Sequence, residues 1–561
     1  MKKRSSIMAV VLASTMVFSS VFTACEGRGD YEEKIDKDKT QLMVQNFDGG
    51  IGTQWLYDLK ERFEETYKDV SFETGKKGVQ ILITPNKEAG NTLSMRANGN
   101  DIVFTEGGKY YDWVAKGDLL DITDVAEKVF AQEGVSIDQD YYDALAYYDK
   151  DKDGKGEVYA LPHYEVYGGA AYNKKIWNNF SLYIKGDADG KVIRDADGNV
   201  VLCNRSASLS VGPDGESGTY DDGLPSTWKD FFYVCDKMKL KGVTPFVLSG
   251  QFHYYTHYLG YAFMSAYGGY DEMYATVGYN TTINYVVNVE KNSNTVLGYD
   301  ITSATEKISN AEGYKVQQLT SKMIAAAAVE KILKNDYLYK PALLGTVSHL
   351  NAQEIFINSM YNNKPIAMLI DGSWWENEAD AAFVSLENVA PNHGKMKSDY
   401  GWMSFPNAID ENDTNPKRVV PADYDFIKAY ALANAYMPQS KVKLAKTFLE
   451  FCYKTDELQA FTANTGISRG LNYSLESSDI DKLSSYSKEI WNYKQTHKIV
   501  RPISNNPLVI ANNADIDNTV TSPVYGILNR KSFDEIDAKT WFTSFAISQA
   551  DWNSQYGKYF N

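Results

Sequence analysis

The chain contains few cysteines and few histidines, and its acidic side chains outnumber the basic ones. Among 561 residues there are four Cys, six His, 57 Lys plus Arg and 73 Asp plus Glu, for a formal net charge of −16. Non-specific binding to DNA or RNA needs clustered positive charge, so this balance argues against a nucleic-acid partner. Four cysteines are too few for a disulfide scaffold. His253 and His257 have the i, i+4 spacing of a zinc pair, but with six histidines in the chain no second cluster supports a metal centre, and a binding or structural role is favoured.

Motifs of nucleotide chemistry are also missing. The sequence has neither a GxxxxGK[ST] loop nor a GxGxxG turn, so nothing favours a phosphate-cradling enzyme. Gly466 to Gly470 (GISRG) has the spacing of a hydrolase nucleophile elbow. That motif needs a strand before the serine and a helix after it, whereas the pattern here predicts a helix and then a loop, so we interpret the match as chance.

Length and aromatic content are the positive features. A chain of 561 residues with 43% hydrophobic residues is too long for one core, so two or more lobes are expected. Tyr occurs 41 times, against 24 Phe and 10 Trp. Tyrosine combines an apolar face with a hydroxyl, which suits half-wet binding surfaces, but ordinary packing also explains the number.

The N-terminus has the features of an export signal. Lys2, Lys3 and Arg4 precede an apolar stretch over Ile7–Phe22, and Thr23-Ala24-Cys25 resembles a lipobox. We expect a lipoprotein signal peptide over 1–24, acylation of Cys25 (palmitate included) and a charged tether over 25–39, which together anchor the protein at a membrane surface. An ordinary signal peptidase site beside a cysteine is the alternative. No later stretch reaches the ~20 apolar residues of a transmembrane helix.

Short apolar runs alternate with amphipathic segments after the tether. Gln41–Asn46, Val79–Thr84 and Asp101–Thr105 predict strands, and Thr53–Tyr67 predicts a helix. This alternation indicates an α/β lobe with a largely parallel sheet, whose ligands bind at the carboxyl ends of the strands. Further along, we expect a strand crossing between lobes over Val158–Tyr172, an insertion with a hairpin over Leu182–Gly223, helices over Phe231–Leu240, Lys315–Leu333 and Ser440–Tyr453 (capped by Ser440), and a buried strand over Lys364–Ile370.

Two acidic loops have residues suited to calcium. Asp149, Asp151 and Asp153 match the start of an EF-hand loop, although Ala160 stands where the bidentate glutamate is needed. Asp214, Asp221 and Asp222 form a second oxygen-rich turn. Ordinary Asp-Gly turn chemistry is the alternative for both loops. Any calcium would be structural, and we expect no other cofactor.

Five segments in order resemble the family 1 extracellular solute-binding proteins, the sugar-capturing components of ABC importers of the maltose-binding type. They are DIVFTEGGKYYDWVAKGDLLDIT (101–123), GEVYALPHYEVYGGAAYNKKIW (156–177), LPSTWKDFFYVCDKMKLKGVTPF (224–246), KPIAMLIDGSWWENEA (364–379), and KVKLAKTFLEFCYKTDELQAF with TGISRGL (441–471). The resemblance implies an α/β, two-lobe periplasmic-binding-protein type II fold with hinge-crossing strands. Lobe 1 would span 40–162 with 420–472, and lobe 2 would span 163–419 with 473–561, including insertions 182–223 and 273–313.

The resemblance also implies a carbohydrate held between closing lobes, because aromatic rings stack on the apolar face of a sugar and polar groups bind its hydroxyl rim. Trp374 is the expected stacking platform, since Gly372 and Ser373 should leave room above it. The implied binding residues are Phe47, Asp48, Glu106, Tyr110, Tyr164, Glu165, His253, Tyr254, Trp374, Trp375, Asp423, Tyr424 and Arg469.

The expected function is therefore a monomeric, lipid-anchored, extracytoplasmic protein that binds oligosaccharide and delivers it to ABC permease subunits, without catalysis. Three alternatives stay open: a peptide- or other solute-binding protein on the same plan, a surface glycoside hydrolase using Glu106 and Glu165 as its carboxylate pair, and a polysaccharide-adhesion module without a transporter.

Overall fold

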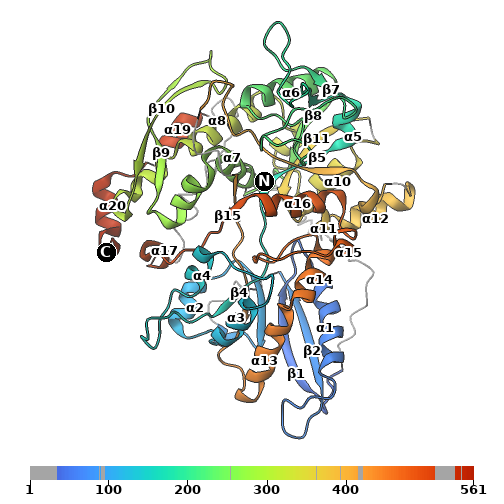
Figure 1. The fold of residues 1–561 in the computed structure, drawn as a ribbon, viewed down its shortest axis with the longest axis vertical. Coiled ribbons are helices and arrows are strands. Elements are labelled where there is room, and N and C mark those ends of the chain that lie inside the picture. Colours follow the sequence, from blue (N-terminus) through green and yellow to red (C-terminus); the bar gives the residue numbers. More distant parts are fainter. Residues whose placement is uncertain are drawn as a thin grey trace, which may run out of the picture. The chain divides into compact units, whose positions relative to one another are not determined.

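The computed structural model describes residues 34–87, 89, 95–252, 254–361, 363–391, 393–414, 421–511, 537–544 and 546–560 (Figure 1). The chain from Asp36 to Asn561 forms one compact unit. The predicted signal peptide, Cys25, most of the tether and His253 lie outside the described residues.

A five-stranded sheet forms the core of the first lobe, in the order β2-β1-β3-β14-β4. β1 pairs in parallel with β2 and β3, as expected, but β14 is antiparallel to both β3 and β4. The prediction of a largely parallel sheet was wrong only at β14, which lies between β3 and β4 and runs opposite to both, because the chain leaves the sheet through β4 and re-enters it in the opposite direction. The strands are β1 (Thr40–Phe47), β2 (Val79–Asn86), β3 (Ile102–Glu106), β4 (Ala160–Pro162) and β14 (Ala429–Ala433).

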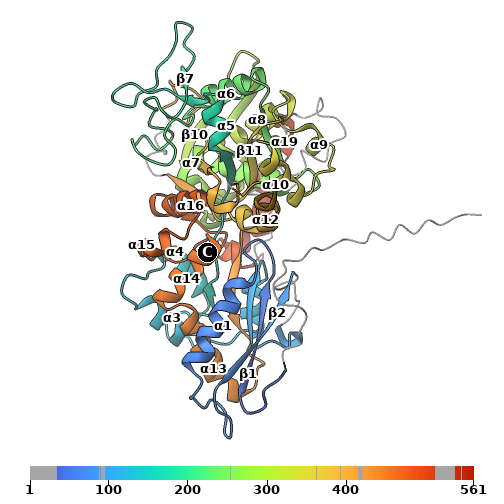
Figure 2. The same ribbon diagram turned by 90° about the vertical axis from the view of Figure 1, so that its right-hand side faces the viewer.

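Amphipathic helices cover this sheet. Helix α1 (Gln54–Thr66) buries Trp55, Leu56, Leu59 and Phe63, residues spaced to share one helical face, and it lies beside β1 and β2 in Figure 2. Helices α3 (Thr123–Phe130), α13 (Gln439–Cys452) and α14 (Thr455–Thr465) complete the layer. The Ser440 cap was wrongly predicted: Pro438 occupies the cap position, and the Ser440 hydroxyl donates to Glu73 Oε1 instead (3.1 Å).

A four-stranded sheet forms the core of the second lobe, in the order β12-β5-β11-β8. β11 is parallel to β8 and antiparallel to β5, and β12 is antiparallel to β5. Helix α7 (Tyr254–Gly278) packs against β5 and β11 and is kinked at Gly269, where φ is +67°. The strands are β5 (Gly168–Asn173), β8 (Thr244–Leu248), β11 (Ile366–Gly372) and β12 (Tyr400–Met403), which places a strand where Lys364–Ile370 was predicted.

Two regions of the second lobe carry additional small sheets. Between residues 182 and 223, β6 (Tyr183–Ile184) pairs with β7 (Leu202–Cys203), and the predicted hairpin appears as a bridge between Arg194 and Val200. Strands β9 (Thr282–Lys291) and β10 (Tyr299–Lys307) form a hairpin next to α8 and α19 (Figure 1). The helix predicted over Lys315–Leu333 is in fact two: the 3₁₀ helix η2 (Asn310–Gln318) and α8 (Thr320–Lys334) meet at Leu319, whose backbone is extended rather than helical.

Three segments connect the sheets: 163–167, the stretch after β13 (Ala422–Tyr424), and the chain that follows α14. The exact lobe boundaries stay predictions. No helix among the described residues is both long and apolar enough to cross a membrane. The remaining elements are η1 (Met95–Ala97), α2 (Tyr110–Lys116), α4 (Gln139–Leu145), α5 (Lys174–Asn179), α6 (Trp228–Leu240), α9 (Lys340–Leu343), α10 (His349–Asn358), α11 (Trp375–Glu378), α12 (Asp380–Val389), η3 (Lys395–Lys397), α15 (Ser477–Ile480), α16 (Ser485–Thr496), β15 (Lys498–Val500), α17 (Pro507–Ala511), α19 (Ala538–Ser544), α20 (Gln549–Tyr556) and η7 (Gly557–Tyr559).

Candidate functional site

The loops at the carboxyl ends of β1 and β11 contact each other. Asn377 Nδ2 in α11 donates to the carbonyl oxygen of Gly50 in the β1–α1 loop (3.2 Å). A Cβ atom built on Gly50 would lie only 2.4 Å from Cγ of Trp374, so this loop rests directly on the indole. Since ligands of α/β proteins bind at the carboxyl ends of strands, this junction of the two lobes is the candidate site.

Trp374 occupies the centre of the junction but is nearly covered, with 9% of its surface exposed. Its ring meets those of Tyr258 and Phe426 edge-on, at centroid distances of 5.9 and 5.7 Å. The indole also folds back over Gly372, where an added Cβ would lie 2.4 Å from Cζ3. The expected open space above Gly372 and Ser373 is therefore wrong: the indole itself fills it, and the Gly50 loop covers the ring in this conformation.

Five further aromatic residues extend from Trp374, and with it they form what we call the aromatic cluster: Phe252, Tyr254, Tyr255, Tyr258, Trp374 and Phe426. Tyr258 and Phe426 stack with centroids 4.0 Å apart, and Tyr254 stacks on Tyr255 at 5.0 Å. Tyr254 is 42% exposed and is the most accessible ring of the cluster. Sequence reasoning named only Tyr254 and Trp374; the signal for three others was the aromatic density of QFHYYTHY (251–258), whereas nothing marked Phe426.

Carboxyl groups from both lobes lie beside these rings, and we call Glu106, Asp371 and Glu378 the carboxylate cluster. Gln353 Nε2 donates to Asp371 Oδ2 (3.0 Å) and to Glu378 Oε2 (2.8 Å). Burial raises the pKa of Glu106 to about 7, with Glu378 adding to the shift and the Tyr164 hydroxyl, which donates to Glu106, opposing it. Burial and then Glu378 raise the pKa of Asp371.

Phe47 and Asp48 lie at the end of β1, as predicted, but both interact within their own loop. The Phe47 ring packs over Gly49, where an added Cβ would lie 2.1 Å from Cε1. Asp48 Oδ1 accepts from the Thr53 hydroxyl (2.8 Å), at the start of α1. Both are half-buried, and with Tyr164 and Glu106 they form the first lobe's part of the site.

Four predicted binding residues are instead packed inside the protein. Tyr110 donates to the Leu145 carbonyl (2.6 Å) and stacks on Tyr430, while Trp375 and Tyr424 are 0% and 1% exposed. Arg469 is fully buried: its guanidinium lies over the Phe461 ring (4.0 Å) and contacts His163. The prediction that these side chains face a ligand was wrong, because each already has interior partners. Their charged or aromatic side chains suggested contact with a ligand, but all four are packed in the interior.

Glu165 is likewise part of an interior ion-pair network and not of an open site. Its Oε1 pairs with Lys494 and its Oε2 accepts from Arg501 Nη2 (2.8 Å), with 1% of the side chain exposed. Glu106 and Glu165 therefore do not form an accessible carboxylate pair, and the residues proposed for glycoside hydrolysis are not arranged for it.

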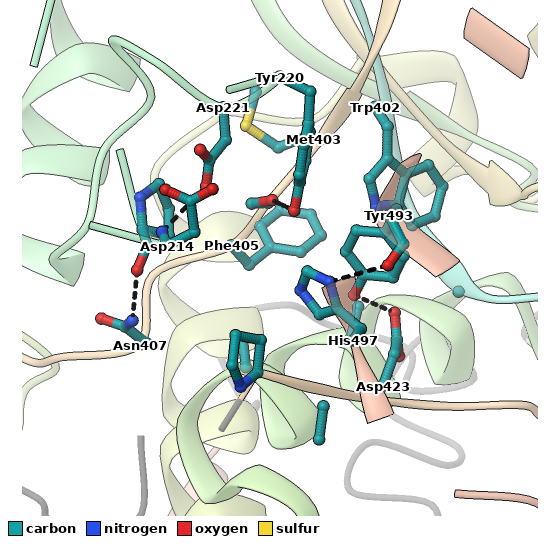
Figure 3. Close-up of a pocket in the computed structure, with 17 residues that line it drawn as sticks. Asp214, Tyr220, Asp221, Trp402, Met403, Phe405, Asn407, Asp423, Tyr493 and His497 are labelled. Atoms are coloured by element: carbon teal, nitrogen blue, oxygen red, sulfur yellow. Dashed lines mark hydrogen bonds between the residues drawn. The ribbon is translucent and has the colours of Figure 1, made fainter. Parts of the chain in front are cut away.

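Asp423 lines a cavity of about 90 Å³ that the residues of the junction do not line, shown in Figure 3. The Tyr493 hydroxyl donates to Asp423 Oδ2 (2.5 Å), and the Ser404 hydroxyl donates to Tyr220 (2.7 Å). Burial raises the pKa of Asp423 to about 7, and burial with the neighbouring Asp214 raises that of Asp221 to about 8. None of the residues in the aromatic or carboxylate cluster lines this cavity.

The two acidic loops differ in geometry. The carboxylates of Asp149, Asp151 and Asp153 converge within 4.8 Å of one another, but they also accept backbone N–H groups of their own loop, as Asx turns do. The loop of Asp214, Asp221 and Asp222 forms no comparable group of three among the described residues. Calcium binding at the first loop stays a prediction.

Neither a family model nor a curated protein sequence matches the chain. Solved structures do match. A chitin oligosaccharide binding protein aligns with a TM-score of 0.54 at 14% identity, over 92% of this chain and 100% of its own. The binding protein MsmE of Bacillus subtilis strain 168, in an open conformation, aligns with a TM-score of 0.50 at 13% identity, over 93% and 100%. The predicted two-lobe α/β fold is confirmed, and it is shared with these binding proteins.

Proposed function

We propose that this protein is the extracytoplasmic binding component of an ABC importer and captures an oligosaccharide between its two lobes, without catalysing a reaction. One observation carries the proposal. The aromatic cluster and the carboxylate cluster lie together where the strands of both sheets end, so stacking faces and hydroxyl-binding groups are available from both lobes at once. The fold shared with a chitin oligosaccharide binding protein supports this assignment.

The geometry also explains how binding is coupled to lobe closure. The contacts of the Gly50 loop with Trp374 and Asn377 exist only when the lobes are together. A ligand stabilises that state only through contacts it makes to both lobes, here Glu106 with Tyr164 on one side and Trp374 with Tyr254 on the other. In this proposal the covered state of Trp374 corresponds to the closed form, and rotation of the lobes would expose the indole.

Export, acylation of Cys25 and docking of the closed complex on permease subunits complete the proposal. They are supported by the signal-like N-terminus and by the solute-binding fold. The lipid anchor would hold a monomer at the membrane beside its transporter.

Isothermal titration calorimetry against a panel of β- and α-linked oligosaccharides and of short peptides tests the function. We expect at least one oligosaccharide to bind, peptides not to bind, and Trp374→Ala to abolish sugar binding. Binding of peptides without any sugar would contradict the proposal. Release of reducing ends from a bound glycan would show an enzyme instead.

A further inference from the structure

The carboxylate cluster has an excess of acceptors and, within the described part of the chain, has no Lys or Arg partner. There, no Lys or Arg forms an ion pair with Glu106, Asp371 or Glu378, and the His349 imidazole lies 3.7 Å from Glu378 Oε1. Glu165, by contrast, is neutralised by two buried cations, Lys494 and Arg501. Buried carboxylates without a counter-ion repel one another and are costly to keep ionised.

The three carboxyl groups come from opposite sides of the lobe junction. Glu106 ends β3 of the first sheet, whereas Asp371 lies in β11 and Glu378 in α11 of the second lobe. Glu378 is close enough to raise the pKa of Glu106. Closing the lobes therefore brings carboxyl groups together across the site, which favours their protonated forms, and a cation held between them would allow them to ionise.

An unpartnered buried acceptor lies within the same cluster. Gln353 is 1% exposed, and its Nε2 donates to both Asp371 and Glu378, but its Oε1 has no hydrogen-bond donor among the described residues. Most buried side-chain oxygens in folded proteins accept a hydrogen bond, so an amide oxygen without a donor is unusual. As far as the described residues extend, the cluster is short of hydrogen-bond donors as well as of positive charge.

Aromatic faces complete the arrangement. The half-exposed Tyr254 ring stacks on Phe252 (5.6 Å), which lies 5.6 Å from the His349 ring beside Glu378. Burial and then the three carboxylates raise the pKa of Tyr254. Tyr255 stacks on Tyr254 and lies 6.2 Å from the His349 ring. Aromatic faces next to carboxylates are the surroundings that an ammonium group prefers, because the ring quadrupole attracts the cation while the carboxylates accept its three N–H donors.

We propose that the captured ligand is an oligosaccharide with free amino groups, whose ammonium is held between Glu106 and Glu378 against the Tyr254 ring. This inference rests on the proposed function and narrows its substrate class. A neutral sugar would supply hydroxyl donors but no charge, so it would not offset the cost of ionising the clustered carboxyl groups. An N-acetylated sugar would bring one amide N–H donor together with a further carbonyl acceptor, and no charge.

Calorimetry with three β-1,4-linked tetrasaccharides of equal length separates these cases: the glucosamine oligomer, its N-acetylated form and cellotetraose. At pH 6.5 and low salt we expect the amine to bind about 10- to 100-fold more tightly than either neutral oligomer, a preference that weakens as salt is added. Equal affinities, or a preference for the N-acetylated form, would overturn the inference while leaving the proposed function intact. Binding of spermidine with no oligosaccharide would overturn both.

Variants identify the groups responsible. Glu378→Gln and Glu106→Gln should each bring the affinity for the amine close to that for cellotetraose, because each removes one of the two carboxyl groups that would ionise to balance the ammonium. Glu354→Gln, at an exposed position of α10, is the matched control and should keep the full preference. If the preference survives both cluster substitutions, the ammonium is bound elsewhere and the assignment fails. The comparison of ligands on the parent protein is decisive even if a variant does not fold.

Discussion

The ion-pair network around Glu165 should be a principal source of stability at the junction of the lobes. Glu165 lies in segment 163–167, which joins the two sheets, whereas Lys494 lies near the end of α16 and Arg501 follows β15. Arg501 Nη1 also donates to Asp138 Oδ2 (2.5 Å), and Lys494 Nζ donates to the Arg469 carbonyl (2.9 Å). The side chains of Glu165, Lys494 and Arg501 are 1%, 3% and 5% exposed, so water screens the charges very little.

Substituting Glu165→Gln removes the one negative charge that these two buried cations share. Breaking a buried pair by removing one partner costs about 3–5 kcal/mol, because the remaining charge stays desolvated. With urea m-values of about 1–3 kcal/mol/M, the midpoint of unfolding should fall by about 1 M or more. The matched control is Glu450→Gln, whose partner Lys128 lies 2.8 Å away with both side chains well exposed, and which should cost less than about 1 kcal/mol.

The effect of pH has a defined sign. Burial alone would raise the pKa of Glu165, but Lys494 and Arg501 together hold it below its ordinary value of 4.5. The carboxylate therefore stabilises the folded state fully above that ordinary value, and this contribution is lost as the pH falls through the lowered pKa. Urea unfolding of Glu165→Gln and Glu450→Gln at neutral and acidic pH measures this contribution. If Glu165→Gln proves as stable as Glu450→Gln, the buried network does not hold the junction together.

Three other substitutions probe closure, packing and titration separately. Gly50→Ala should weaken ligand affinity at least about tenfold in calorimetry without lowering the unfolding midpoint, because its Cβ would lie 2.4 Å from the Trp374 indole only in the closed form. The control is Gly99→Ala, whose Cβ would meet no neighbour within 4 Å. Phe63→Ala should cost about 3–5 kcal/mol in urea unfolding because the fully buried ring packs on Phe448 and Phe451, and a loss below about 1 kcal/mol would contradict that packing. Burial raises the pKa of Asp423 to about 7, so between about pH 4 and 7 the folded state keeps a proton there that the unfolded state releases, and the free energy of unfolding falls as the pH rises. Asp423→Asn should remove this fall, which amounts to up to about 1.4 kcal/mol per pH unit. Parallel curves of stability against pH for parent and variant would show that Asp423 does not titrate in this range.

Much of the fold was predictable because hydrophobic periodicity reports which face of an element is buried. The strands at Gln41–Asn46 and Val79–Thr84 and the buried face of α1 were placed within one or two residues. Strand direction at β14 was not predictable, since it depends on how a segment from far along the chain re-enters the sheet. The division of Lys315–Leu333 at Leu319 was missed because no Gly or Pro in that stretch marks the break.

Site residues were predictable only where they end or directly follow a strand, because that position alone places them at the edge of the sheet. Phe47, Asp48 and Glu106 follow or end strands and therefore lie at the sheet edge, and Trp374 follows β11 for the same reason. Partners were not predictable. Nothing in the sequence marks Lys494 and Arg501 as the counter-ions of Glu165, or Phe426 as the ring that stacks on Tyr258. Residue type alone could not distinguish the buried Arg469 from a ligand-binding arginine.

A crystal structure of the protein with a bound oligosaccharide would test capture between the lobes without any intermediate assumption. We predict a sugar ring between the two sheets, in van der Waals contact with Trp374 or Tyr254 and hydrogen-bonded to Glu106 or Glu378. A sugar bound away from these residues, for example in the cavity beside Asp423 and His497, would contradict the proposed binding site.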